Sequence, residues 1–472
     1  MMNLWTRGRS HLIMSAVSLL CFTAATKAQS PSLLLQDAIR TGLTNYQSLK
    51  AKKDYLNASS ALAVNVKNDY LPNVIAGLQQ NYGTINGQFG PMAPAGILGV
   101  SSAGPASDKQ SWAAAFGSLY IINTNWEAFT FGRRQSRIDA ASAQVRKDSA
   151  DLLQEEFIQS IRISGAYLNL LIAQRLILNA QSNLERATTV KNAVLARTLS
   201  GLNAGVDSSI ANAEVSRARL ALIDANNNEQ QLRNILIQQM NIAPETLFLL
   251  DSSFFKKIPV SFTNTGDIEQ NPQVQYYASR VAQSTKQEEA IRKSILPGIN
   301  LFGIFQARGS GFDYNYAPGF TDRYSKSYFE GIKPARANYV AGFSVSWNII
   351  SPTKIKQQVV AQQFITKAYR DEYDLVQSQL KAQLSFADQR IENSLRSFHE
   401  VPNQYKSATD AYIQKSVLYK NGLTTIIDLQ QALYAVNKAE TDVSVAYINV
   451  WQALLQKAAA SGDLDLFLKQ VK

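Results

Sequence analysis

The chain presents the same succession of features twice, with the second copy about 221 residues after the first. In each copy a helical segment ends at a leucine-proline pair, two strand-like segments follow, and a long helical hairpin turns at a glycine-leucine pair. The matching residues are Pro72 and Pro297, Trp126 and Trp347, Gly201-Leu202 and Gly422-Leu423, and Asp207 and Asp428. A repeat that combines short strands with helices far longer than a globular core requires predicts an assembly element, such as the wall of a pore.

These landmarks divide the 472-residue chain into successive parts. We expect a signal peptide over residues 1–28, a first repeat over 29–241, an equatorial linker over 242–270, a second repeat over 271–457 and a short polar tail over 458–472. Arg7 and Arg9 before an apolar run, and small residues at 26 and 28, are typical of a secretory signal and its cleavage site. Since Cys21, the only cysteine, lies in that run, we expect the mature protein to have no disulfide.

Four segments of about ten residues alternate apolar and polar side chains, at about 72–82, 112–126, 297–308 and 338–348. In the first, Val74, Ala76 and Leu78 alternate with polar or small residues. Ten residues suffice for a tilted strand to cross a bilayer, whereas no run of eighteen apolar residues follows the signal, so strands and not helices are expected to span the membrane. A soluble antiparallel sheet with one wet face would show the same alternation.

Long helices dominate the rest of each repeat. Shorter helices are expected over 32–71 and 271–296, whereas residues 131–199 contain no proline and would span roughly 100 Å as one helix. After the second tip an a/d heptad of large and small layers is formed by Leu429, Val436, Val443 and Val450, and by Ala432, Ala439, Ala446 and Ala453. Small residues at every second layer suit helices that close into a cylinder, although an ordinary two-helix hairpin would show the same period.

The residues of enzyme and metal chemistry are scarce. After the signal only one histidine remains, His399, which excludes Ser-His-Asp and Cys-His nucleophiles and any zinc site of usual ligand count. Phosphate-binding and dinucleotide motifs are also missing, so we expect a protein that is not an enzyme and uses no cofactor or metal. The formal net charge of +11 is interpreted as surface solvation, with no nucleic acid as partner.

The hairpin tips have residues that fit their local structure. Gly201 and Gly422 suit helix ends with a left-handed backbone, and Thr425 can pair with Asp428 to cap the helix that follows. Asp207 or its neighbour Ser208 can cap the returning helix of the first repeat. These roles leave the apolar neighbours of the two glycines unexplained, and Asp428 is open to a second interpretation as part of a negative ring in a lumen.

Taken in order, these residues resemble the outer-membrane efflux protein family, the TolC-like exit ducts of Gram-negative bacteria. The resemblance covers nearly the whole mature chain. It rests on the leucine-proline junctions at Pro72 and Pro297, on Trp126-x-x-Phe129-x-x-Gly132-Arg133, and on Tyr419-x-x-Gly422-Leu423-Thr424-x-x-x-Asp428. It implies a mixed α+β membrane protein in which a homotrimer forms one 12-stranded transmembrane β-barrel, with four strands per protomer, continued by a periplasmic α-helical coiled-coil barrel.

The resemblance also assigns roles to single residues. It implies docking of a periplasmic adaptor at tip residues Gly201, Leu202, Gly422, Leu423 and Thr424, a lumen aperture near Asp428 and Gln431, and helix-strand junctions at Pro72, Pro297, Trp126, Gly132 and Trp347. The chain departs from the family at the second strand exit, where Trp347 is followed by neither the phenylalanine nor the glycine of the first exit. It departs again at Thr424 and Gln431, where the family places an arginine and an acid, which puts an arginine lock and a double acidic ring in doubt.

The function expected from this resemblance is that of a passive duct in the outer membrane, which exports drugs or other small solutes together with an adaptor and an inner-membrane transporter. A duct of the same fold for secreted proteins remains open, because the helical seam carries no information on cargo. A coiled-coil scaffold with a small soluble sheet is the alternative from another class. A stand-alone diffusion porin is disfavoured, since a porin has no use for helices of this length.

Overall fold

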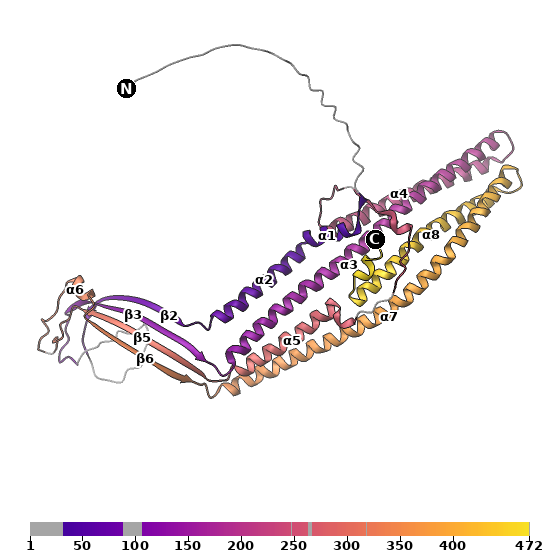
Figure 1. The fold of residues 1–472 in the computed structure, drawn as a ribbon. Helices are drawn as coiled ribbons and strands as arrows, with labels where there is room; N and C mark the ends of the chain where they lie inside the picture. The colour runs from indigo at the N-terminus through magenta and orange to yellow at the C-terminus, as the bar shows by residue number, and fades with distance from the viewer. Residues whose placement is uncertain (1–31, 88–105, 247, 263–266, 318, 472) are drawn as a thin grey trace, which may run out of the picture.

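The computed structural model describes residues 32–87, 106–246, 248–262, 267–317 and 319–471. The expected signal peptide and Cys21 therefore lie outside the described residues. The molecule is elongated, with a curved sheet at one end, long helices through the middle and two helical hairpins that end in tips at the other end (Figure 1).

The sheet consists of four antiparallel strands in the order β2-β3-β5-β6. The strands are β2 (Asn73–Thr84), β3 (Ala114–Phe129), β5 (Gly298–Ser310) and β6 (Arg336–Ser346), each within a few residues of a segment in which alternation had predicted a strand. The two central strands, β3 and β5, join the two halves of the sequence. The outer edges of β2 and β6 pair with no other strand in the described chain.

Strand register gathers the apolar side chains on one face of the sheet. Paired residues of neighbouring strands share a face, and Ala76, Ile122, Phe305 and Tyr339 form one such row across all four strands. Trp126, Leu301 and Phe343 form a second row on that face, and Phe343 is 71% exposed. Polar residues such as Asn123, Asn125, Gln306 and Asn338 lie on the other face, between apolar ones. An exposed apolar face of this kind fits contact with lipid.

Each strand connects directly to a helix at the same end of the sheet. Helices α2 (Gln47–Asn68) and α5 (Pro272–Lys293) lead into β2 and β5, whereas α3 (Arg133–Leu199) and α7 (Ser351–Lys420) follow β3 and β6. These helices pack side by side in the order α2-α3-α5-α7. Farther from the sheet, α4 (Gly205–Met240) and α8 (Ile426–Ser461) return from the tips and pack on α3 and α7 (Figure 1). At 67 residues, α3 is roughly 100 Å long.

The interpretation of residues 32–71 as one helix is wrong. The segment forms a short strand, β1 (Ser32–Leu33), then α1 (Leu35–Asn45), and α2 begins only after Tyr46, whose backbone is extended. The break lets α1 turn its apolar side, with Leu35 and Ile39, into the core while α2 continues along α3. Periodicity alone gives no sign of this break, because both helices are amphipathic.

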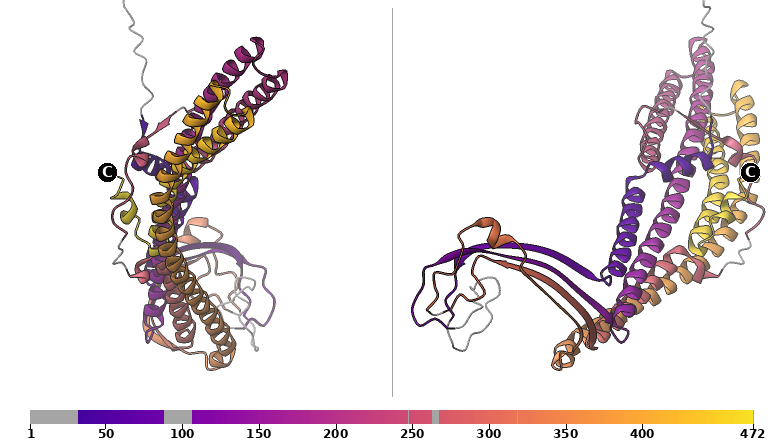
Figure 2. Two further views of the ribbon diagram at one scale, coloured as in Figure 1. Left: turned by 90° about the vertical axis from the view of Figure 1, so that its right-hand side faces the viewer. Right: turned by 60° about the vertical axis from the view of Figure 1, so that its left-hand side comes forward.

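A single large core lies at the middle of the molecule. It joins α1, α3, α4 and α8 with the 3-10 helix η2 (Ser252–Phe255), the strand β4 (Leu249–Leu250), which pairs with β1, and α9 (Asp465–Leu468). Trp451 of α8 donates its indole N–H to the carbonyl of Phe254 at 3.1 Å and stacks edge-on against that ring. Figure 2 shows the short elements of this region gathered on one side of the long helices.

This core bears on two sequence interpretations. Residues 458–472, expected as a short polar tail that could pack around the middle of the helical bundle, do pack there: Phe467 is fully buried against Trp451, and α8 itself continues to Ser461. Also, one 18-residue window of α3 reaches a mean hydropathy of 1.2, enough by composition for a membrane span, which the search for an unbroken apolar run overlooked. Since 44% of that window is buried inside the protein and α3 supplies Ile163, Tyr167 and Leu171 to the core, packing accounts for its hydropathy.

The heptad of α8 forms the seam between the two hairpins. Leu429, Val436 and Val450 are buried, as are Ala439, Ala446 and Ala453 on the small layers. Helix α8 packs against both α7 and α3 along this seam. The small layers therefore leave no room for larger side chains.

We predict that Ala439→Phe or Ala446→Phe destabilises the folded protein by roughly 1–3 kcal/mol, because a bulky ring overpacks a closed alanine layer. The neighbouring Lys438→Phe is the control, since Lys438 is exposed. Thermal unfolding and the yield of folded protein provide the measurement. Equal tolerance of phenylalanine at all three positions would show that the seam is not tightly packed.

Candidate functional site

The strand-helix junctions of the two halves use the same hydrogen bond. The indole N–H of Trp126, near the end of β3, donates to the carbonyl of Tyr70 at 2.9 Å, and that of Trp347, just after β6, donates to the carbonyl of Ile295 at 3.0 Å. Each carbonyl lies two residues before a proline, Pro72 or Pro297. The proline stops the incoming helix and disfavours helix at the residue before it, so these carbonyls have lost their usual helical partners. The tryptophans thus satisfy groups that the prolines leave open.

An arginine ties the first junction to the second. Arg133, the first residue of α3, donates from Nη1 to the carbonyl of Leu296 at 2.9 Å and forms an ion pair through Nη2 with Glu127 of β3. Gly298 lies under this pair, and a Cβ there would come within 2.7 Å of the Glu127 Oε1 atom and 3.0 Å of the Arg133 Nη2 atom. A side chain at 298 would therefore have to displace the ends of the Glu127 and Arg133 side chains. In the sequence, Arg133 stands out only as part of a motif, and nothing marks Glu127. Its ion-pair partner, Arg133, lies six residues away across a turn.

The two strand exits differ, as their sequences suggested. Gly132 adopts a left-handed backbone with φ of 93° and precedes α3, and Phe131 before it also has a positive φ of 52°. At the second exit the side chain of Asn348 accepts from the amide of Ile350 at 3.1 Å and its carbonyl accepts from Ser351. A side-chain turn therefore replaces the glycine at the second exit.

The hairpin tips share one backbone design. Gly201 and Gly422 have φ values of 73° and 78°, in the region that a side chain disfavours. The next amide reaches back to close the helix end, from Leu202 to the carbonyl of Arg197 and from Leu423 to that of Leu418, both at 2.9 Å. This is the bonding of a Schellman motif, and it leaves Leu202 and Leu423 68% and 72% exposed.

The two returning helices begin differently. Thr425 and Asp428 form the expected capping box, and the Asp428 carboxylate also accepts from the Thr424 hydroxyl at 2.8 Å. These hydrogen bonds lower the pKa of Asp428, so their contribution to stability is complete above its ordinary range and is lost as pH falls through the lowered pKa. The expected cap by Asp207 or Ser208 is wrong, because α4 starts after Ala204 with no side-chain cap.

Asp207 instead belongs to a set of contacts that joins the two tips, here called the tip clasp. Asn203 donates from its amide nitrogen to Asp207 at 2.7 Å and to the hydroxyl of Tyr419 at 2.9 Å, on the other hairpin. Arg197 donates to Asn203 at 2.9 Å and to the carbonyl of Lys420 at 2.6 Å. Burial raises the pKa of Tyr419, which keeps its hydroxyl neutral.

Comparison with known proteins agrees with this geometry. No curated protein sequence matches the chain. Residues 38–241 match the family model for outer membrane efflux proteins. The resemblance to outer membrane efflux proteins inferred from the junctions and tips is thereby confirmed.

Solved structures extend the likeness to both halves. The structure of CusC superimposes with a TM-score of 0.74 at 11% identity, over 92% of this chain and 93% of that one. The CmeC outer membrane channel of Campylobacter jejuni gives 0.72 at 14% identity, over 91% and 85%. The open state of the MtrE outer membrane channel of Neisseria gonorrhoeae gives 0.70 at 17% identity, over 91% and 89%. At these identities the comparisons establish a shared fold.

The structure brings some predicted site residues together and separates others. The tip residues of the two hairpins lie beside one another through the tip clasp, and Thr424 and Asp428 are in contact. Gln431 is exposed on α8, one turn farther along. Arg197 and Asn203 were missed, since an arginine in a last helical turn and an asparagine in a loop are common. Here an arginine from the first hairpin reaches the second tip, where it donates to the carbonyl of Lys420.

We predict that Arg197→Gln loosens the tips, because it removes a charged donor that joins the two hairpins. Amide hydrogen exchange of residues 420–425 should accelerate about fivefold, as expected for the loss of one net hydrogen bond. Arg219→Gln is the matched control, since Arg219 is exposed on α4 away from the tips. Unchanged exchange in Arg197→Gln would show that the clasp does not hold the tips together.

Proposed function

We propose that three copies of this chain form an outer-membrane exit duct for drugs or other small solutes, docked at its tips to a periplasmic adaptor and an inner-membrane transporter. The observation that carries the proposal is that the protomer is a slab open along both edges. The edge strands β2 and β6 have unpaired backbone groups, which cannot remain open in lipid. Pairing β6 of one copy with β2 of the next removes every edge when the ring closes. The same tryptophan-to-carbonyl bond at both strand-helix junctions supports a two-repeat organisation.

The edge helices support the same arrangement. Helix α2 exposes Tyr55 and Leu62 on one edge of the slab, and α7 exposes Phe364 and Phe386 on the other. Apolar side chains of this size are normally covered in an assembled protein. Contact between α7 of one copy and α2 or α4 of the next would continue the strand pairing into a helical barrel.

Adaptor docking is proposed at the tips, where Gly201, Leu202, Gly422, Leu423 and Thr424 lie. Both leucines are exposed, and each follows a glycine whose left-handed backbone disfavours a side chain. Each tip therefore presents an apolar side chain beside backbone that no side chain covers. Such a surface suits the apolar face of another helical hairpin. Asp428 is proposed to lie near the lumen aperture with Gln431, although its carboxylate is also occupied by the capping box.

A duct of the same architecture that carries secreted proteins is the second candidate. The helical seam is lined by alanine and aliphatic residues that face neighbouring helices, so it favours neither cargo. The coiled-coil scaffold loses support, since the solved channel structures share both the sheet and the helices of this fold.

We predict that the protein purified in mild detergent has the mass of three chains, because one protomer's four strands cannot close a barrel. Native mass spectrometry or light scattering with detergent correction would establish the number. A stable monomer that is soluble without detergent would contradict the duct and favour the scaffold.

We predict that Gly422→Asp and Leu423→Asp abolish export in cells while the assembled protein remains inserted. Aspartate adds a side chain where the backbone is left-handed and a charge where an apolar contact must lose water, which should weaken docking by about 2 kcal/mol. Drug susceptibility of a deletion strain with each variant is the readout, together with adaptor crosslinking and the quantity of trimer. Lys438→Asp is a control that places an aspartate on an exposed position of α8 away from the tip. Normal resistance in both tip variants would exclude docking there.

A further inference from the structure

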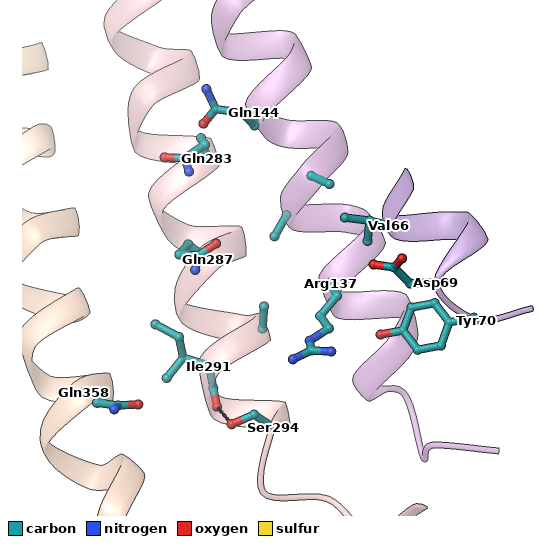
Figure 3. A pocket seen from close by; sticks show the side chains of 13 residues that line it. Val66, Asp69, Tyr70, Arg137, Gln144, Gln283, Gln287, Ile291, Ser294 and Gln358 are labelled. Carbon is teal, nitrogen blue, oxygen red and sulfur yellow. Dashed lines mark hydrogen bonds between the residues drawn. The ribbon is translucent and has the colours of Figure 1, made fainter. Parts of the chain in front are cut away.

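A polar groove lies where the helices approach the sheet. It has a volume of about 620 Å³, within the range of small-molecule sites, and its walls come from the end of α2, the start of α3, the end of α5 and the start of α7. Asp69 and Tyr70 lie on one side and Gln283 and Gln287 on the other, with Arg137 between them (Figure 3). The floor includes Ala140, Ala141, Ala290 and Ile291.

The groove opens on the side of the helix layer opposite the central core. Tyr167 of α3 faces that core, where its hydroxyl donates to the carbonyl of Leu33 at 2.7 Å. Ala140 precedes Tyr167 by 27 residues, or about seven and a half turns, and therefore points to the opposite side of α3. In the proposed duct the core elements must lie outside the ring, because inside it they would fill the lumen, and the groove on the opposite side of the helix layer then faces the lumen next to the sheet.

Several polar side chains of the groove have few or no hydrogen bonds within the described part of the chain, whereas the Gln144 amide donates to Asp148 at 2.9 Å. Arg137 has no hydrogen bond or ion pair with any described residue, and Asp69 has only the Asn65 amide at 3.5 Å. Tyr70 is 93% buried and its hydroxyl is shielded from solvent, yet this hydroxyl has no hydrogen-bond partner in the described part of the chain. A buried hydroxyl without a partner is rare in native proteins and indicates that something else fills its place.

We propose that this groove is a binding site for small zwitterionic solutes on their way through the duct. Arg137 binds the carboxylate, Asp69 binds the ammonium group, and the side-chain amides of Gln283, Gln287 and Gln358 hydrogen-bond the polar parts between them. The alanine and isoleucine floor accommodates an apolar body. This inference names a cargo class and rests on the proposed duct, because only a passing solute reaches a groove in the lumen.

The test uses the intact trimer in detergent and three peptides that differ only in charge. Leu-Leu is a zwitterion at pH 7, N-acetyl-Leu-Leu carries only the carboxylate, and Leu-Leu-amide carries only the ammonium group. Binding is measured by calorimetry or saturation-transfer NMR. We expect Leu-Leu to bind at least about tenfold more tightly than either single-charge peptide, the effect of losing one charge-assisted hydrogen bond.

Variants assign the two charges. Arg137→Gln should lower the affinity for Leu-Leu and N-acetyl-Leu-Leu about tenfold and leave that for the amide unchanged, whereas Asp69→Asn should do the reverse. Lys67→Gln is the control, because Lys67 is exposed on α2 and does not line the groove. Circular dichroism and trimer yield check folding. If the Arg137→Gln trimer does not assemble, the peptide affinities of Asp69→Asn test the proposal on their own.

The outcome separates this inference from the duct itself. Trimers that conduct ions across a planar bilayer but bind the three peptides equally, or not at all, would overturn the groove and leave the duct intact. Selective binding of Leu-Leu by trimers that never conduct would overturn the duct and leave the groove as a site.

Discussion

The structure depends on the junctions where the chain passes from helix to strand and back, twice, at one end of the sheet. At each passage from helix to strand, backbone carbonyls lose their helical hydrogen bonds. The indole N–H groups of Trp126 and Trp347 and the guanidinium of Arg133 donate to these carbonyls. Because these bonds run from strand ends to helix ends, they fix the direction of four helices relative to the sheet. The slab, its open edges and the groove beneath the sheet all follow from that fixed direction.

Polar bonds dominate the junctions, whereas apolar packing dominates the middle. There, Tyr167, Phe254 and Trp451 bring together segments more than 80 residues apart in sequence. Burial of such aromatic side chains contributes more than any single hydrogen bond in the molecule. The long helices therefore need one strong point of attachment at half their length, while their ends are held by a few directional contacts. Stability is concentrated at the centre, and the tips depend on capping and on the clasp.

Sequence could predict the features that repeat with a period or stop a helix. Strand alternation located all four strands, and the heptad located the buried layers of α8, since burial imposes those periods directly. Sequence could not predict the break at Tyr46 or the burial of Phe467, because both are decided by distant partners in the central core. It also missed the tip clasp, whose residues are individually ordinary and meet only when two hairpins lie side by side. The capping box of Thr425 and Asp428 could be predicted because its residues are three positions apart in sequence. The same reasoning was wrong for Asp207, whose carboxylate accepts from Asn203 and does not cap α4.

The uneven capping of the two tips has a consequence for an assembled ring. The second hairpin begins its returning helix with a complete capping box, while the first begins with none, and its Asp207 accepts from Asn203 of the same hairpin. A closed ring of three chains would then carry six loops of two kinds in alternation, three with a capped returning helix and three without. Acid that protonates Asp428 would weaken the three capped loops, so the rim would soften with threefold symmetry.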